Sequence, residues 1–201
     1  MLRFLLLFVF AGSVQAAPLL LIENTIKIKG MITGDNPELI AEYYKFKDMA
    51  QQPIINIYID SPGGEVEAGF YFVDLMHQYQ TKGTKFNCFV NNEAYSMAFI
   101  ILSACDDRYI WPGTHLLFHQ VREYLSGIYL AGELGEMSEI LTNHNNHLLD
   151  LLLSSGLRAS FLFHYFFLEK AFNYQEFSQH APGWITQIDH ISTTRLDLFD
   201  D

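Results

Sequence analysis

The sequence places a serine and a histidine where nucleophilic catalysis would need them. Ser96 follows the stretch 91–95 and opens an apolar segment that runs to Cys105. If this segment is a helix, its unpaired N–H groups and its dipole favour negative charge that develops beside the serine hydroxyl. A serine at this position can also be an ordinary helix cap, which is the commoner use of the residue.

His119 ends the apolar run 116–118 and is the candidate base for such a serine. A serine nucleophile needs a base within hydrogen-bond reach and usually a third group that orients the base. A histidine at the end of a strand can reach over the edge of a sheet, but alone it is more often a core or surface residue. The spacing of Ser96 and His119 does not by itself show that they meet.

A pair of glycines, Gly63 and Gly64, follows the apolar, β-branched run 54–59 and the residues Asp60-Ser61-Pro62. Paired glycines after a buried strand let the backbone approach a ligand closely, because neither carries a Cβ atom. We expect Ser61 to end the strand and the glycines to form the turn into the next helix.

The segments that must position these residues alternate between strand and helix patterns. The predicted strands are 26–29, 54–59, 86–90, 109–111, 116–118 and 184–191. The predicted helices are 37–50, 65–80, 96–105, 131–155 and 160–172. This alternation predicts an α/β fold with a mostly parallel sheet flanked by helices.

Length and composition limit the choices further. The chain has 201 residues, half of them hydrophobic, which suits one domain with a sizeable core. The net charge of −11 argues against a nucleic-acid binder, because an acidic surface repels phosphates. His144 and His147 could share a metal, but without an HExxH pattern a solvated helix face is the stronger interpretation. We expect neither a metal nor a cofactor.

The N-terminus has the pattern of a secretory signal. Arg3 precedes the apolar run 4–11, and Val14 and Ala16 are the small residues of a cleavage site. We expect residues 1–16 to be a signal peptide and 17–201 a single domain in the periplasm or outside the cell. The alternatives are an uncleaved anchor and a plain buried strand.

The catalytic segments together resemble a known family. Residues 57–64 resemble the "YINSPGG" segment of the Clp protease proteolytic subunit, and residues 94–98 resemble its "AASMGA" turn. Residues 112–120 resemble its "LPNSxxMIHQP" strand. The order and approximate spacings agree, and the resemblance covers about residues 25–190.

The resemblance implies a fold of repeated ββα units that wind in a spiral, as in the Clp-protease/crotonase superfamily. It implies a serine-type endopeptidase that cleaves peptides or unfolded proteins. Ser96 would be the nucleophile, His119 the base, and the N–H groups of Gly64 and Met97 the oxyanion hole. Glu169 lies at the position of the third, acidic member. A homo-oligomer is implied as well.

Several positions depart from the family pattern. Glu169 replaces an aspartate, Ala98 replaces a glycine and Tyr95 replaces an alanine. These changes leave open an inactive homologue that serves as a subunit or scaffold. A serine–lysine dyad ranks lower, because no lysine lies between Lys85 and Lys170.

The family works with an ATPase partner. An exported protein would meet no ATP, so we do not expect it to have such a partner. If residues 1–16 are not a signal, the implied function is instead a cytoplasmic subunit of an ATP-dependent protease.

Two further features remain open from the sequence. Cys88 and Cys105 lack the spacing of a disulfide framework, which favours two buried thiols, although export would permit a bridge. The aromatic stretch 161–167 can be a core helix or an oligomer interface.

Overall fold

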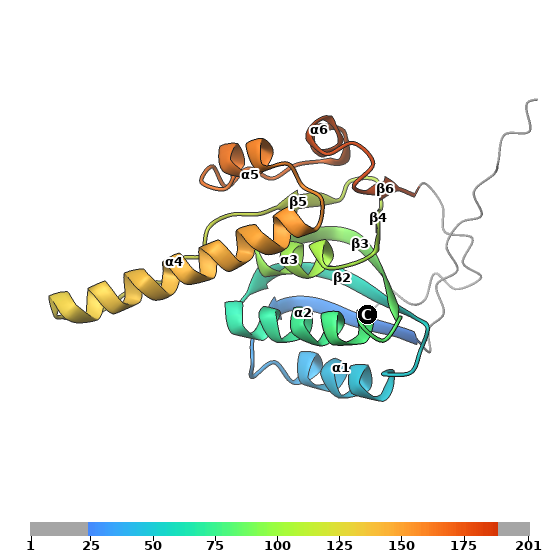
Figure 1. Cartoon of the computed structure of the whole chain (residues 1–201), viewed down its shortest axis with the longest axis horizontal. Helices are drawn as coiled ribbons and strands as arrows, with labels where there is room; N and C mark the ends of the chain where they lie inside the picture. The colour runs from blue at the N-terminus through green and yellow to red at the C-terminus, as the bar shows by residue number, and fades with distance from the viewer. Residues whose placement is uncertain (1–23, 189–201) are drawn as a thin grey trace, which may run out of the picture.

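The computed structural model describes residues 24–188, so the predicted signal peptide at 1–16 lies outside the described residues. Strands and helices alternate as the sequence predicts, and the strands pair in parallel (Figure 1). The strands are β1 (Thr25–Ile32), β2 (Ile54–Gly64), β3 (Lys85–Tyr95), β4 (Asp107–Ile110), β5 (His115–Leu117) and β6 (Thr186–Gln187). The helices are α1 (Pro37–Asp48), α2 (Val66–Gln80), α3 (Met97–Ser103), α4 (Ala131–Ser154), α5 (Ala159–Tyr165) and α6 (Tyr174–His180).

The sheet has the order β1-β2-β3-β4-β6, and β5 joins it beside β3. β3 pairs with β4 through residues 87–90 and with β5 through residues 93–95. The first half of β3 therefore lies beside β4, and its second half lies beside β5. This double pairing brings the C-terminal end of β3, where Ser96 follows, beside the strand that precedes His119.

The two central strands are buried mainly in their first halves, where most residues are apolar. In β2, Ile55, Ile57 and Ile59 have no exposed surface, and in β3 the same holds for Phe86 and Val90. Strands covered on both faces read as continuous apolar runs rather than alternating ones. α3 packs on both strands and also contacts α2 and α4, so the helix that follows Ser96 is itself buried.

The structure corrects two predicted boundaries. Residues 61–64 do not end the strand: β2 continues through Gly64, which pairs with Ile32 of β1. The predicted helix 160–172 ends at Tyr165, because Phe172 instead forms an antiparallel bridge with Leu116. A separate helix, α6, then begins with a capping box between Asn173 and Glu176.

The last predicted strand, 184–191, is represented in the described residues only by β6. The predicted start was wrong, because Trp184 and Ile185 precede the strand, and residues 189–191 lie outside the described residues.

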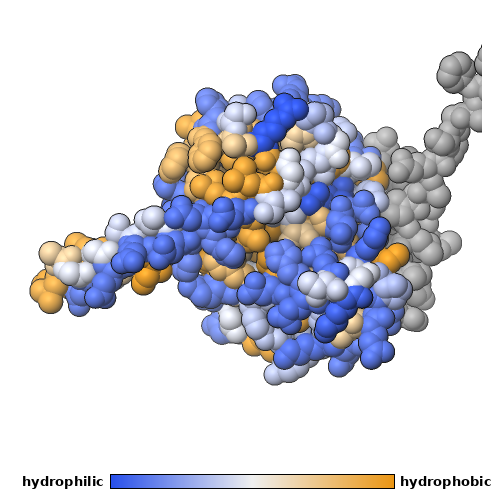
Figure 2. All heavy atoms as spheres, viewed as in Figure 1, coloured by the Kyte–Doolittle hydropathy of each residue, from blue (hydrophilic) through white to orange (hydrophobic). Residues whose placement is uncertain are grey.

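Helix α4 projects from the body, with its N-terminal end outermost (Figure 1). Only Leu148 and Leu152, near its C-terminal end, are buried. Toward its other end, Leu130, Leu134 and Ile140 are exposed, and apolar surface is visible there in Figure 2. Within residues 24–188, no helix combines the length and apolar character needed to cross a membrane.

The aromatic stretch on α5 has two kinds of face. Phe161 and Phe166 are buried in the core, whereas Phe163, Phe167 and Leu168 are more than half exposed. Figure 2 shows apolar surface above α4, in the region of α5. The stretch is therefore a core element on one side and an uncovered apolar surface on the other.

Cys88 of β3 and Cys105, which follows α3, form a disulfide with their Cα atoms 6.0 Å apart. The preference for two free thiols was therefore wrong. Sequence spacing could not show that β3 and the end of α3 lie side by side. The bridge closes a loop with a sequence separation of 17 residues, and this loop contains Ser96.

We expect the bridge to resist alkylation and to stabilise the fold. Iodoacetamide should add no mass to the denatured, unreduced protein and two adducts after reduction. Replacing both cysteines with alanine should lower the free energy of unfolding by about 2–4 kcal/mol, as loops of this length predict. Two adducts without reduction would show that the thiols are free.

Candidate active site

Ser96 joins β3 to α3 in a strained backbone conformation. Its φ is 52° and its ψ is −122°, a region that residues with a Cβ atom rarely adopt. Its N–H donates to the carbonyl of Leu117 at 2.9 Å, which ties the turn to β5. Its side chain makes no capping hydrogen bond to α3, so the ordinary helix-cap interpretation does not apply. The strained turn instead leaves the hydroxyl free to point into a pocket.

Gly63 makes room for this turn. A Cβ atom added to Gly63 would lie 2.6 Å from Cβ of Ser96 and 2.6 Å from the carbonyl oxygen of Tyr95. Its φ of 94° is also a conformation that favours glycine. The first glycine of the pair therefore sets the position of Ser96.

We expect Gly63→Ala to reduce peptide hydrolysis at least about tenfold, because even a small displacement of reacting groups is costly. Gly83→Ala is the matched control: Gly83 has a φ of 96°, but nothing lies within 4 Å of its added Cβ. Both variants carry the same backbone strain, so urea unfolding and turnover measured together isolate the clash with Ser96. Equal losses of activity in the two variants would contradict this role.

Ser61 fixes the backbone of the glycine pair at the end of β2. Its buried hydroxyl donates to the carbonyl of Gly30 at 2.6 Å and accepts from the N–H of Gly63 at 3.1 Å. The sequence shows Ser61 only as part of a turn, because its partner Gly30 is distant in the chain. The contact explains how the turn can keep the conformation that Ser96 needs.

Ser96 and His119 line the same pocket. It has a volume of about 250 Å³, and Gly64 and Met97 line it as well. β5 brings His119 there, because Leu117 is bonded to Ser96 and His119 follows two residues later. Within residues 24–188 no hydrogen bond joins Ser96 to His119. Such bonds are often long in the absence of substrate and tighten when it binds.

The ring of His119 is held by its own main chain. Nδ1 lies 2.5 Å from the carbonyl oxygen of Gln120, and because a carbonyl only accepts, Nδ1 carries the proton. In the neutral ring, Nε2 is then the acceptor that a general base needs. Burial lowers the pKa of His119, and the nearby charge of Arg122 lowers it further. The hydrogen bond to Gln120 and the charge of Glu169 act in the opposite direction.

Glu169 lies at the tip of a loop that spans the strand of His119. On one side Phe172 exchanges hydrogen bonds with Leu116, and on the other Phe166 accepts from the N–H of Gln120. Glu169 has a φ of 49°, in the left-handed region. Its Oε1 lies 2.8 Å from Nη1 of Arg122, and it makes no hydrogen bond to His119 in the described chain. Its charge nevertheless acts on the ring.

The resemblance assigns the oxyanion hole to the N–H groups of Gly64 and Met97. Met97 is the first residue of α3, so its N–H has no acceptor within the helix. Gly64 packs so tightly against β1 that an added Cβ would lie 2.1 Å from the carbonyl oxygen of Ile32. Both residues line the pocket of Ser96.

Ser103 and Cys105, the other serine and the cysteine of the segment 96–105, do not line this pocket, and neither do His144 and His147. Ser103 and Cys105 are buried, and the hydroxyl of Ser103 donates to the carbonyl of Ile100. His147 packs edge-on against Phe70, and Nε2 of His144 lies 3.6 Å from Glu67. Among the described residues, no three His, Cys, Asp or Glu side chains gather as metal ligands would.

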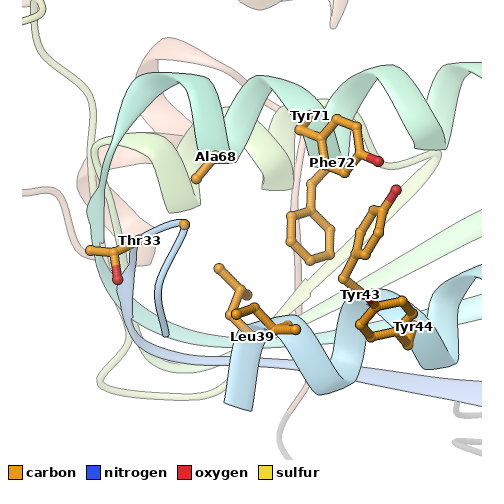
Figure 3. A pocket seen from close by; sticks show the side chains of 9 residues that line it. Thr33, Leu39, Tyr43, Tyr44, Ala68, Tyr71 and Phe72 are labelled. Carbon is orange, nitrogen blue, oxygen red and sulfur yellow. The ribbon is translucent and has the colours of Figure 1, made fainter. Parts of the chain in front are cut away.

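A second pocket, between α1 and α2, offers no such chemistry (Figure 3). It has a volume of about 320 Å³ and a largely apolar lining. Tyr43 and Tyr71 face one another across it with ring centroids 4.7 Å apart. It holds neither a charged side chain nor a residue of the Ser96 pocket, so it is separate from the candidate active site.

Comparison with known proteins gives a consistent result. The model of the Clp protease family matches residues 13–155. The ATP-dependent Clp protease proteolytic subunit of Carsonella ruddii (strain PV) is 27% identical over 151 residues, which cover 70% of this chain and 76% of that protein. The family match contains both glycines of the turn, Ser96 and His119, and it ends before Glu169.

Proposed function

The chain belongs to the Clp protease family, and on that premise we propose that it is a serine endopeptidase that cleaves peptides or unfolded proteins. The observation that carries the proposal is the pocket shared by Ser96 and His119. The serine there sits in a strained turn at the start of a helix rather than in a cap. Strain of this kind at a pocket is typical of functional residues.

In the proposed mechanism, Oγ of Ser96 attacks the scissile carbonyl while Nε2 of His119 takes its proton. His119 then gives this proton to the leaving amine. In the second half of the reaction, His119 takes a proton from water, the water attacks the acyl-enzyme, and the proton returns to Oγ of Ser96. The N–H groups of Gly64 and Met97 stabilise the oxyanion, a contribution of about 3–4 kcal/mol per donor in such enzymes. Glu169 is the proposed acidic member of the triad.

The shape of the site favours an internal cut in a longer chain. The Ser96 pocket continues into a larger one of about 530 Å³, and the two share Met31, Gly64, Val66, Val121, Arg122 and Tyr124. The adjoining pocket gives a substrate room beyond the residues next to the scissile bond. This arrangement suits an endopeptidase better than an enzyme that trims chain ends.

We also propose that the protein is a homo-oligomer. α4 exposes Leu130, Leu134 and Ile140, and the segment at α5 exposes Phe163 and Phe167. Apolar surface of this extent on a soluble protein is typical of contact with another chain. Size-exclusion chromatography with light scattering should give a mass that is a multiple of the chain mass.

The proposed location is the periplasm or the outside of the cell. The signal pattern at residues 1–16 supports it, and so does the bridge between Cys88 and Cys105, because disulfides persist in oxidising compartments. An ATPase partner is then not expected. The Carsonella ruddii relative is a proteolytic subunit of an ATP-dependent protease, and this similarity favours the alternative that the chain is such a subunit.

N-terminal sequencing of the protein from its own cell decides between these locations. Export predicts a mature chain that begins at Ala17 and is recovered outside the cytoplasm. A chain that begins at Met1 in the cytoplasmic fraction would support the ATP-dependent alternative.

The activity itself is tested by incubating the purified protein, without any ATPase, with fluorogenic peptides and with unfolded casein. We expect cleavage that a fluorophosphonate abolishes. No cleavage together with no fluorophosphonate labelling would support the inactive homologue that acts as a subunit or scaffold.

A further inference from the structure

The carboxylate of Glu169 is bonded to Arg122 instead of His119. Nη1 of Arg122 lies 2.8 Å from Oε1 of Glu169. Nδ1 of His119 donates to the carbonyl of Gln120 at 2.5 Å. The proposed acid and base are therefore neighbours whose hydrogen bonds go to other partners in this arrangement.

We propose that Arg122 is a positioning residue that competes with His119 for Glu169 and so restrains the activity of the site. The site becomes fully active when the carboxylate leaves Arg122 and accepts the Nδ1 proton in place of the Gln120 carbonyl. This inference rests on the proposed function, which makes His119 the base and Glu169 the acid.

The loop that carries Glu169 keeps it close to both partners. Hydrogen bonds at Phe166 and Phe172 fix the two ends of the loop on the strand that leads through His119. Glu169 lies between these anchors, so a change of side-chain rotamer, without movement of the whole loop, can redirect its carboxylate. Helix α4 holds the main chain next to Arg122, because the N–H of Val121 donates to Oδ1 of Asn145 at 2.7 Å.

The pair is weak enough to be released. The side chains of Arg122 and Glu169 are 46% and 44% exposed, and exposed ion pairs of this kind contribute little because water screens them. A carboxylate is also a stronger acceptor for an imidazole N–H than a neutral carbonyl is. Releasing Glu169 from Arg122 therefore costs little free energy, and removing Arg122 should favour the contact with His119.

The chemistry of His119 depends on which arrangement is present. Burial is the main cause of its lowered pKa, and Arg122 lowers the pKa further while Glu169 raises it. A carboxylate on Nδ1, no longer neutralised by Arg122, would make Nε2 a stronger base. A stronger base at Nε2 takes the proton of Ser96 more readily.

A double-mutant cycle tests the competition. Arg122→Gln, Glu169→Gln and the double variant are compared with the parent on an uncharged peptide substrate. Arg122→Gln should raise kcat/KM about two- to fivefold, the range that release of an exposed ion pair allows. In the Glu169→Gln background the same substitution should change nothing, because Arg122 acts through Glu169.

Lys170→Gln is the matched control. Lys170 is adjacent to Glu169, is 40% exposed and pairs with Glu176 at 3.4 Å, so its removal takes away the same charge without freeing Glu169. We expect the parent rate from this variant. A fall in kcat/KM for Arg122→Gln, or an equal change in both backgrounds, would overturn the proposal.

A second readout does not need activity. In the Ser96→Ala background, the Nδ1–H proton resonance of His119 should move downfield on Arg122→Gln, because the stronger acceptor has replaced the carbonyl. It should not move when Glu169→Gln is also present. An unmoved resonance overturns the competition even if peptides are cleaved. If the parent protein, with Ser96 intact, neither cleaves peptides nor is labelled, a moved resonance supports the competition for Glu169 but rejects the proposed function.

Discussion

Ser96→Ala should reduce turnover of a peptide substrate by roughly 10⁴- to 10⁶-fold, the range found when a serine nucleophile is removed. The loss follows from the geometry of the turn. The main chain at Ser96 is fixed by β5 and by Gly63, and among the described residues that line its pocket Ser96 is the only serine, threonine or cysteine. The measurement is single-turnover and steady-state hydrolysis of a fluorogenic peptide.

Ser103→Ala is the control for this substitution. Ser103 lies in the same helix, and its hydroxyl is buried and donates to Ile100. Removing this hydroxyl should leave the rate of peptide hydrolysis near that of the parent and should lower the free energy of unfolding only modestly. If Ser96→Ala and Ser103→Ala have equal rates, the nucleophile is elsewhere.

The second large effect is expected at His119. His119→Gln should lower kcat by roughly 10⁴-fold or more, because base and nucleophile act as a unit. Circular dichroism should be unchanged, since within residues 24–188 the partly buried ring is hydrogen-bonded only to the carbonyl of the next residue.

The parent enzyme should also show the pH dependence of this base. Catalysis requires neutral His119, so activity is present above its pKa and lost as pH falls through it. Burial, reinforced by Arg122, lowers that pKa from its ordinary value of 6.5. The acid limb of kcat/KM, which reports the free enzyme, should therefore lie below pH 6.5. An acid limb above this value would contradict the assignment of His119.

The overall fold could be predicted from the sequence because its strong signals are local. The β-branched run of β2 and the helical spacing of apolar residues in α2 each lie within one segment. The order of these segments then implies a parallel sheet. Asn36 followed by Pro37 likewise begins α1 as predicted, and Asn36 accepts from the N–H groups of residues 38 and 39.

What could not be predicted depends on contacts between distant segments. Residues 61–64 carry the residue types of a turn, yet they remain in β2 because Ile32 of β1 pairs with Gly64. The pattern of 160–172 is helical throughout, yet the chain leaves the helix after Tyr165 because Leu116 binds Phe172. The bridge between Cys88 and Cys105 has the same origin.

The candidate site shows the same division. Ser96 and His119 stand out because a serine at the start of an apolar helix and a histidine at the end of a strand are visible in the sequence. Arg122 does not, since its partner Glu169 lies far along the chain and an exposed arginine is ordinary. The Gln120 carbonyl that orients His119 is a main-chain group, which no residue type reveals.

The central claim, that Ser96 is the nucleophile, is tested most directly by mapping a fluorophosphonate adduct. The protein is labelled, digested and sequenced by mass spectrometry, with the Ser96→Ala variant treated in parallel. We predict one adduct on the Oγ of Ser96 in the parent and none in the variant. An adduct at another residue, or an equal yield in the variant, would contradict the claim.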